Sequence, residues 1–311
     1  MKKILTFTLN PTIDKSAKVD NVRAEAKLSC DTVRYEPGGG GINVSRAIKK
    51  LGGSSLLVYT SGGFTGRKLD TLLAQEELNL KSIEIEASIR ENFIAFERAS
   101  QQQYRFGMPG PEISDSEYHK IFDTFKNIED FPEYFVISGS IPAKTNFGIY
   151  ADLAGLAKKR GSKVIVDVSG APLKEVMKEG VFLIKPNIGE FQDLVGKEFQ
   201  YEEEIKEHAF KLIEGSCCEA LVISIGAGGA LLIYQDKAKF MRPPTVPIKS
   251  KVGAGDSMVA GMVLSLSQGK SIEDAFIYGI AAGSAAVMTP GTELCRKIDT
   301  DRLYQGMINK N

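Results

Sequence analysis

Short apolar runs alternate with amphipathic stretches along most of the 311-residue chain, and this alternation constrains the fold more than any other feature. We predict strands at Ile4–Leu9, Ser55–Tyr59, Tyr134–Ile137, Lys163–Val168, Val181–Ile184, Ala220–Ile223 and Ala230–Ile233. We predict helices at Asn43–Lys50, Arg67–Glu76, Asp115–Lys126, Phe147–Lys159, Glu203–Ile213, Asp256–Ser267 and Ile272–Val287. Almost continuously apolar strands between helices indicate an α/β fold, with a mostly parallel sheet covered by helices on both faces.

Two polar stretches, Lys15–Tyr35 and Ser88–Phe106, interrupt the alternation. They are rich in β-forming residues and have little helical period, so we predict extra strands that form a small β-sheet lid. Two long surface loops are the alternative. Because no linker or internal repeat divides the chain, residues 1–311 are predicted to be a single domain with this lid inserted in the core.

Charge and hydropathy exclude two classes of partner. Lys and Arg number 39 and so do Asp and Glu, whereas a protein that coats nucleic acid has a basic excess. No apolar run approaches the roughly 18 residues that a membrane span needs. Asn10 and Pro11 also end the first apolar run before a signal peptide forms. We therefore expect neither a nucleic-acid nor a membrane partner.

Cysteine and histidine usage indicates a cytoplasmic protein without a metal centre built on these residues. The four cysteines form no CxxC pair and are expected to be reduced thiols: Cys30, Cys217, Cys218 and Cys295. The two histidines, His119 and His208, lie in polar helical stretches. Both are expected at the surface, which argues against a Ser-His-Asp triad.

A run of four glycines, Gly38–Gly41, leads directly into a predicted helix. Glycine lets the backbone approach a ligand closely, and a helix start offers unpaired N–H groups. Asn43 adds a side chain that both donates and accepts, which suits a sugar hydroxyl. A flexible turn is the alternative interpretation.

A second glycine cluster, Gly253–Gly255, precedes Asp256 at the start of another helix. Its backbone N–H groups can converge on one spot as an anion hole. A carboxylate beside an anion is unfavourable for simple phosphate binding, but it fits a base that takes a proton from an attacking hydroxyl. An ordinary aspartate helix cap is equally compatible with the pattern.

Two further clusters follow predicted strands. Asn187 and Glu190 face one side of a helix start, where Glu190 could hold Mg²⁺ through its water shell; a plain helix cap is the alternative. The turn Ser224–Ala230 suits nucleotide phosphates or ribose.

The P-loop, the GxGxxG fingerprint and the protein-kinase signatures are all missing from the sequence, so another scaffold must hold any nucleotide.

The glycine, NxxE and GAGD motifs occur together and in this order, and the chain therefore resembles the ribokinase-like (PfkB) family of sugar kinases. The three motifs are Gly38–Asn43, Asn187–Glu190 and Gly253–Asp256, and the resemblance extends from Thr8–Asp14 to Gly283–Ala286. It covers essentially the whole chain.

Within this family the chain is most similar to the phosphofructokinase branch, whose opening TLNP pattern matches Thr8–Asp14. Stretches such as Gln103–Phe106 and Ser138–Ser140 resemble the minor-type bacterial 6-phosphofructokinases. Position 139, within the second stretch, is counted with the substrate site but is given no specific role. Kinases of fructose 1-phosphate and tagatose 6-phosphate usually carry a lysine where this chain has Gly40. This departure favours the 6-phosphofructokinases.

The resemblance implies roles for matching residues at the sugar end. Sugar contacts are implied for Asp14, Gly38, Gly39, Gly40, Gly41 and Asn43. Arg90 and Arg105, in the lid stretches, would bind the sugar phosphate, with help from Lys27 of a partner lid. Asp256 would be the base, and Gly253, Ala254 and Gly255 would stabilise the transferred phosphoryl group.

The resemblance also implies ATP and Mg²⁺ as cofactors. The ATP site would comprise Lys185, Asn187, Ser224, Gly226, Gly229 and Ser284, with Glu190 organising Mg²⁺. Many relatives hold a monovalent cation such as K⁺ on backbone carbonyls, and the corresponding residues are Ser250, Val252, Ala286 and Gly291. The family often has Asp-Thr-Thr before its GAGD motif, where this chain has Ser250–Val252, so the cation site is an open expectation.

The function expected from the resemblance is ATP-dependent phosphorylation of fructose 6-phosphate to fructose 1,6-bisphosphate, a glycolytic reaction. A kinase of fructose 1-phosphate or tagatose 6-phosphate is the alternative. A catalytically silent sugar-phosphate sensor is a third hypothesis, against which Asp256 argues. We expect a homodimer joined through the lids, because a small open sheet cannot bury both faces alone; its apolar side would include Leu28, Phe93 and Phe96.

Overall fold

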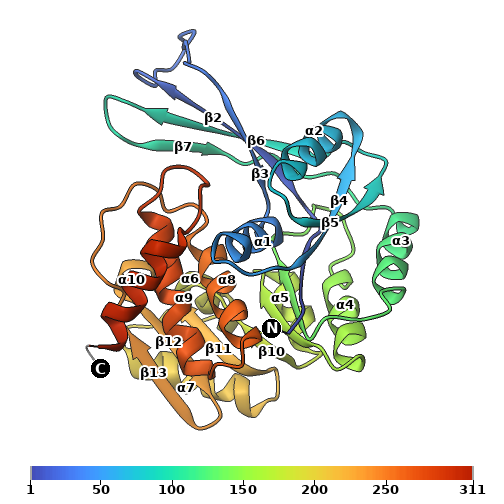
Figure 1. Ribbon diagram of the computed structural model, residues 1–311, viewed down its shortest axis with the longest axis vertical. Coiled ribbons are helices and arrows are strands. Elements are labelled where there is room, and N and C mark those ends of the chain that lie inside the picture. The colour runs from blue at the N-terminus through green and yellow to red at the C-terminus, as the bar shows by residue number, and fades with distance from the viewer. Residues whose placement is uncertain (1, 310–311) are drawn as a thin grey trace.

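The computed structural model describes residues 2–309 and confirms the predicted α/β architecture. Nine strands form the main sheet (Figure 1), in the order β13-β12-β11-β10-β9-β8-β1-β4-β5. All neighbours from β5 to β10 and the β10–β11 pair are parallel, whereas β12 and β13 are added as antiparallel hairpins. Their bounds are β1 Ile4–Thr8, β4 Leu56–Gly62, β5 Asn79–Ile85, β8 Tyr134–Ser138, β9 Lys163–Asp167, β10 Val181–Ile184, β11 Cys218–Ser224, β12 Ala230–Tyr234 and β13 Lys237–Met241.

Helices cover both faces of this sheet, and each face has its own buried apolar cluster. One face packs against α2 Gly63–Ala74, α3 Asp115–Lys126, α4 Ile149–Lys159, α5 Ala171–Met177, α6 Ile188–Val195 and α7 Glu202–Glu214. The other packs against α1 Gly40–Lys50, α8 Ala254–Ser267, α9 Ile272–Val287 and α10 Lys297–Ile308. Among residues 2–309, no helix is long and apolar enough to cross a membrane.

The helices and strands that the sequence did not predict are short or half-exposed: β5, β13, α5, α6 and the half-exposed helix α10. Strand β5 and strand β13 lie at the two edges of the sheet and expose charged side chains, so neither reads as an apolar run. Helices α5 and α6 have only 7 and 8 residues, too few for a clear period. The capping box of Ser114 and Glu117 at the start of α3, by contrast, is a strong local signal.

A separate four-stranded sheet projects from the main body (Figure 1), where the lid strands were predicted. Its order is β3-β2-β6-β7, with bounds β2 Thr12–Val19, β3 Arg34–Gly38, β6 Arg90–Glu97 and β7 Gln103–Phe106. The alternative of two surface loops is therefore wrong. Strand β2 begins before Lys15 and β3 ends beyond Tyr35, so this sheet reaches into the glycine run that starts α1.

The order of the main sheet marks where a ligand is expected to bind. The chain starts inside the sheet at β1, adds β4 and β5 on one side, and then crosses to β8 and β9 on the other. In such sheets ligands bind beyond the carboxyl ends of the strands where this direction changes. Thr8, Ser138 and Asp167 end the strands at this point.

Candidate active site

A pocket of about 320 Å³ opens at this place, between the two sheets. Eight of the predicted sugar and catalytic residues line it: Asp14, Gly39, Gly40, Asn43, Arg90, Arg105, Gly253 and Asp256. The residues that complete the lining are Thr12, Asn92, Ser138, Gly139, Asp167, Lys251 and Val252. Residues that are more than 200 positions apart in the sequence thus meet around one cavity.

The glycine run is closely packed, which excludes the flexible-turn interpretation. Helix α1 begins at Gly40, three residues earlier than predicted, after Gly39 with a φ of 122°. A Cβ atom on Gly38 would lie 2.5 Å from the Asp14 Oδ2, and one on Gly41 would lie 2.3 Å from a backbone oxygen. Only glycine leaves this room. The run therefore brings the backbone against Asp14 and the end of β1.

Asp256 is the third residue of α8 and is not its cap, so the helix-cap alternative is wrong. The cap is Gly253, whose φ of 74° is left-handed and unfavourable for other residues. The Asp256 Oδ2 instead accepts a hydrogen bond from the Asn43 Nδ2 at 2.8 Å. Helices α1 and α8, which come from distant parts of the chain, are thereby joined at the pocket.

The surroundings of Asp256 keep its proton affinity high. Burial and the neighbouring carboxylate of Asp167 raise the pKa of Asp256 to about 7, although Asn43 and Lys185 act in the opposite direction. A carboxylate with a pKa near neutrality can both accept and release a proton at physiological pH. The position of Asp256 therefore suits a general base.

Asp167 is a site residue that the sequence analysis missed. Its Oδ1 pairs with the Lys185 Nζ at 3.0 Å, and both side chains are largely buried. Burial lowers the pKa of Lys185, but Asp167, Glu190 and Asp256 outweigh it and leave the pKa raised. A signal was present, because Asp167 is a carboxylate at the end of a buried parallel strand.

The four-stranded sheet supplies the other side of the pocket. Asp14 is only 6% exposed, and its Oδ1 accepts a hydrogen bond from the Asn92 Nδ2 at 3.0 Å. Burial raises the pKa of Asp14, while Asn92, Arg105 and Arg90 oppose that rise. Asn92 was also missed; it stands opposite Asp14 in the paired strands β2 and β6.

The two arginines of this sheet differ in their contacts. The Arg90 Nη2 donates to the Asn10 carbonyl at 3.1 Å and its Nη1 to the Met108 carbonyl at 3.4 Å. Arg105 is paired with Ile94 through the β7 backbone, but within residues 2–309 no hydrogen bond or ion pair holds its side chain, which is exposed and faces the same pocket. Arg105 thus has its whole guanidinium available for an anion, whereas Arg90 is largely committed to the backbone.

The residues predicted for ATP lie beyond this pocket, around the ends of β10 and β11. Asn187 and Ser224 form a bridge between the two strand ends, and Gly226 and Gly229 flank a short turn after β11. Lys185 links this region to the GAGD loop, because a Cβ atom on Gly255 would lie 3.6 Å from its Nζ. Ser284 is buried on α9.

Glu190 forms the helix cap that the sequence left as an alternative. Its Oε2 accepts from the Asn187 N–H at 2.8 Å, and its own N–H donates to the Asn187 side chain at 2.9 Å. Burial and Asp167 raise its pKa. No group of three or more His, Cys, Asp or Glu side chains in the described part of the chain could hold a metal ion, so a Mg²⁺ role for Glu190 stays a prediction.

The residues predicted for a monovalent cation lie directly before the GAGD loop, in the last turn of α9 and just after that helix. Val252 lines the pocket, and the backbone N–H of Ser250 donates to the Val287 carbonyl, next to Ala286. The Ala286 carbonyl already accepts two hydrogen bonds from Thr289. The site therefore also stays a prediction. Lys251, which belongs to the segment Ser250–Val252 that departs from the family pattern, also lines the pocket.

Comparison with known proteins agrees with this geometry. The model of the pfkB family of carbohydrate kinases matches residues 2–299. The chain is 37% identical over 305 residues to the ATP-dependent 6-phosphofructokinase isozyme 2 of Escherichia coli, with 98% of each chain covered. It is 32% identical over 294 residues to the 1-phosphofructokinase of Bacillus subtilis, covering 93% and 95% of the two chains. A crystal structure of the Escherichia coli phosphofructokinase-2 in complex with fructose-6-phosphate superposes with a TM-score of 0.93 at 36% identity, covering 99% of this chain and 100% of that one.

Proposed function

Because the chain belongs to the pfkB family of carbohydrate kinases, we propose that it is an ATP-dependent 6-phosphofructokinase that works in the cytoplasm. The substrate would be fructose 6-phosphate and the product fructose 1,6-bisphosphate. One observation carries this proposal: Asp256, with a pKa of about 7, lies at the start of α8 in the same pocket as the unpaired Arg105.

The geometry supports a direct transfer. Arg105 would bind the 6-phosphate, and Asp14 and Asn43 would hold the sugar hydroxyls. The 1-hydroxyl then attacks the γ-phosphorus, forming a new O–P bond while the bond to the ADP oxygen breaks, and Asp256 takes the hydroxyl proton. Backbone N–H groups at Gly253–Gly255 stabilise the transferred group, since an α-helix start favours negative charge.

ATP and Mg²⁺ fit the residues around β10 and β11. Lys185 brings a buried positive charge next to Gly255, and the Glu190 Oε1 makes no hydrogen bond within residues 2–309. We propose that Glu190 binds a water of Mg²⁺ there, and that the metal neutralises charge on the phosphates. Lys185, Asn187, Ser224, Gly226, Gly229 and Ser284 would surround the nucleotide.

We also propose K⁺ as a cation held by carbonyls of Ser250, Val252, Ala286 and Gly291. Ser250 and Val252 precede the GAGD loop, Ala286 lies in the last turn of α9 and Gly291 follows that helix, so a bound cation would hold the segment before the anion hole against the end of α9. Equal rates in potassium salts and in salts of a bulky organic cation would contradict this.

The packing at Gly40 favours fructose 6-phosphate over the alternative substrates. A Cβ atom there would lie 2.2 Å from the Ser138 Oγ and 2.7 Å from the backbone N of Gly139. The lysine typical of fructose 1-phosphate and tagatose 6-phosphate kinases therefore cannot replace Gly40 unless the end of β8 moves. The close packing at Gly40 therefore supports the preference for fructose 6-phosphate.

A single comparison of substrates tests the function. We expect the highest kcat/KM with fructose 6-phosphate among fructose 6-phosphate, fructose 1-phosphate, tagatose 6-phosphate and free fructose. Arg105→Ala should weaken sugar-phosphate binding by about 10-fold or more, because charge-assisted hydrogen bonds contribute roughly 1.5–3 kcal/mol each. The apparent affinity for ATP should hardly change. A higher kcat/KM with free fructose would contradict the proposal.

We further propose that two copies pair through the four-stranded sheet. Paired positions across its strands place Tyr35, Lys15, Phe93 and Phe106 in one row on the face opposite Asp14 and Asn92. Phe93 and Phe106 stack with ring centroids 6.1 Å apart, and Phe106 is 48% exposed. Phe96 belongs to the other face, because it is three residues from Phe93, so the predicted apolar side cannot include both.

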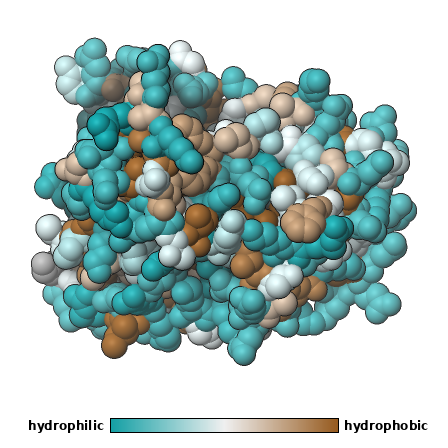
Figure 2. All heavy atoms as spheres, turned by 90° about the horizontal axis from the view of Figure 1, so that it is seen from above, coloured by the Kyte–Doolittle hydropathy of each residue, from teal (hydrophilic) through white to brown (hydrophobic). Residues whose placement is uncertain are grey.

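The surface around the four-stranded sheet carries both hydrophobic and hydrophilic residues. Figure 2, which views the molecule from above, shows hydrophobic residues as separate areas within a mostly hydrophilic surface. Phe106→Asp should therefore suffice to reduce the mass in solution from a dimer to a monomer. Ile298→Asp, at a residue 78% exposed on α10, is the matched control and should leave the dimer intact. A monomeric wild-type protein with full activity would contradict the pairing.

A further inference from the structure

Arg46 is a buried guanidinium that joins three segments of the chain near the pocket. It lies on α1, three residues after Asn43, and is 5% exposed. Its Nη2 pairs with the Glu76 Oε1 at 2.7 Å, and its Nε donates to the same oxygen at 2.9 Å. Its Nη1 donates to two backbone carbonyls, those of Pro37 and Thr292, at 3.3 Å each.

The Pro37 carbonyl belongs to the end of β3, directly before the glycine run, and the Thr292 carbonyl belongs to the loop between α9 and α10; both segments lie next to the proposed chemistry. Pro37 directly precedes Gly38, where a Cβ atom would collide with Asp14. Thr292 is 1% exposed and is two residues from Leu294, which is fully buried and has a φ of 67°. The Leu294 Cδ2 lies only 2.4 Å from where a Cβ atom on Gly253 would be.

The contacts therefore form a continuous path from one side of the pocket to the other. The end of β3, which leads into the glycine run, is bonded through the Pro37 carbonyl to Arg46. Arg46 is bonded to the Thr292 carbonyl, and Leu294 packs under the cap of α8. Leu294 itself is fixed, because its carbonyl accepts a hydrogen bond from the Thr289 Oγ1 at 2.9 Å. Moving the end of β3 or the loop that contains Thr292 would break a hydrogen bond to the buried Arg46 guanidinium.

We propose that Arg46 is a positioning residue for phosphoryl transfer, which holds the sugar-binding glycine loop and the anion-hole loop at a fixed separation. The inference rests on the proposed function. It assigns the two carbonyl bonds to catalysis and the Glu76 ion pair to stability. A guanidinium suits this task, since its planar arrangement of donors serves a carboxylate on one side and carbonyls on another.

The test separates these two sets of contacts. Arg46→Met removes all the donors but keeps much of the stem, whereas Glu76→Gln, the matched control, removes the charge pair and leaves the carbonyl bonds. Both variants should melt at a lower temperature than the wild type. Misplaced groups at a reaction centre cost about 10- to 100-fold in rate. We expect a fall of this size in kcat for Arg46→Met, a smaller change in KM, and a nearly unchanged kcat for Glu76→Gln.

Hydrogen exchange gives a readout that does not depend on activity. Peptides covering residues 37–41 and 289–294 should exchange faster in Arg46→Met and at the wild-type rate in Glu76→Gln. If Arg46→Met does not fold, Arg46→Lys replaces it; one nitrogen cannot make all four contacts, so kcat should again fall. A normal kcat in the arginine variant that folds, or an equal fall in Glu76→Gln, would overturn the inference. If the wild type itself does not phosphorylate fructose 6-phosphate, the proposed function fails, and hydrogen exchange still decides the role of Arg46.

Discussion

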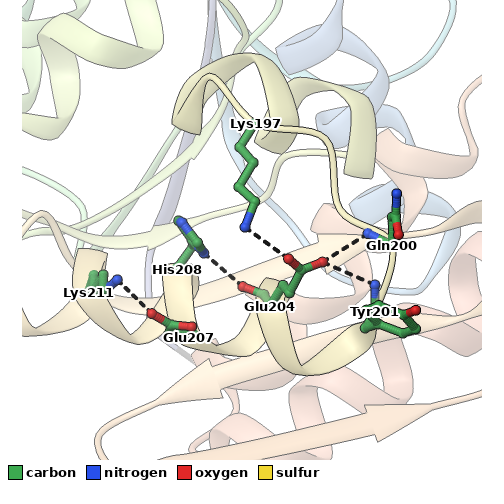
Figure 3. A network of polar contacts seen from close by, with 7 residues as sticks. All are labelled: Lys197, Gln200, Tyr201, Glu204, Glu207, His208 and Lys211. Carbon is green, nitrogen blue, oxygen red and sulfur yellow. Dashed lines mark hydrogen bonds and ion pairs between the residues drawn. The ribbon is translucent and has the colours of Figure 1, made fainter.

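Asp256 and Glu204 occupy the same position, the third residue of a helix, in two regions of the molecule with opposite electrostatics. At the start of α7 (Figure 3), Glu204 accepts hydrogen bonds from the N–H groups of Gln200 and Tyr201 and pairs with Lys197. The Lys197 ion pair and these N–H groups lower the pKa of Glu204 to about 2. At the start of α8, burial raises the pKa of Asp256 to about 7.

The difference comes first from burial, because Asp256 is enclosed and Glu204 is not, and then from the residue that caps each helix. The chain before α7 is extended, so Glu204 can reach back to its N–H groups. The cap of α8 is Gly253 in a left-handed conformation, and no capping hydrogen bond forms there. The carboxylate of Asp256 is left to Asn43 and to the pocket. The Glu204 carboxylate is thus held by the N–H groups at its helix start, whereas the Asp256 carboxylate makes no such bond and faces the pocket.

Glu190 combines features of both. It caps α6 through Asn187, as Glu204 caps α7, but burial and Asp167 raise its pKa, as they do for Asp256. A capping carboxylate that is also enclosed near other acids is suited to a cation. Substitutions of Asp256, Glu190 and Glu204 can therefore test how burial and capping set the behaviour of each carboxylate.

Asp256→Asn gives the largest expected effect. The amide keeps the shape and the contact with Asn43 but cannot take a proton. General base catalysis typically contributes about 10²–10⁴-fold, so kcat should fall by this factor while both substrates still bind. Steady-state kinetics with fructose 6-phosphate and ATP measures it. Glu204→Gln is the control at the same helix position and should have a normal kcat; a near-normal kcat in Asp256→Asn would remove Asp256 from catalysis.

Glu190→Gln should raise the Mg²⁺ concentration needed for half-maximal activity. An amide loses the charge that attracts the metal and its waters, and the sugar site is separate. The measurement is a Mg²⁺ titration at saturating fructose 6-phosphate, with KM for the sugar phosphate as the internal control. An unchanged titration would leave Glu190 as a helix cap alone.

The difference in stability between Asp256→Asn and the wild type should depend on pH in a defined direction. The folded pKa, about 7, is above the unfolded value of 3.8, so the native state loses stability as pH rises from the lower value through the higher one. Above about pH 7 the native protein carries the full cost of this charge. Asp256→Asn should therefore melt at a higher temperature than the wild type at alkaline pH, and this advantage should shrink toward pH 4. A lower melting temperature at alkaline pH would contradict the raised pKa.

Glu204→Gln should have the smallest effect, and one of opposite sign. Because the folded pKa of Glu204 is lowered to about 2 from 4.5, its stabilisation is present above the unfolded value and is lost as pH falls toward the folded one. The variant should melt slightly below the wild type near neutrality and at the same temperature in strong acid. Thermal scans across this pH range decide it; a variant that is more stable at neutral pH would refute the assignment.

The sequence predicted the sheet and the glycine motifs because each has a local signal. The apolar runs give buried strands, and Gly38–Gly41 and Gly253–Gly255 are recognisable where they stand. The roles of Asp167 and Asn92 were missed because each depends on a partner from elsewhere in the chain. Asp167 pairs with Lys185, and Asn92 faces Asp14 only through the register of β2 and β6.

Arg90 and Arg105 show the same limit. The sequence treats them as an equivalent pair in two β-rich stretches. Folding gives Arg90 two backbone carbonyls and leaves Arg105 without such partners among the described residues. Tertiary contacts, which no local pattern reports, decide which guanidinium is free to bind an anion.

The pH dependence of kcat/KM tests most directly whether Asp256 is the base. The profile for fructose 6-phosphate reports groups of the free enzyme and should be recorded from about pH 6 to about pH 9 at saturating ATP and Mg²⁺. We predict that the wild type loses activity below about pH 7, as Asp256 becomes protonated. Asp256→Asn should lack this limb and retain only the ionisation of the sugar phosphate, which both proteins share. Identical profiles for the two proteins would contradict the account.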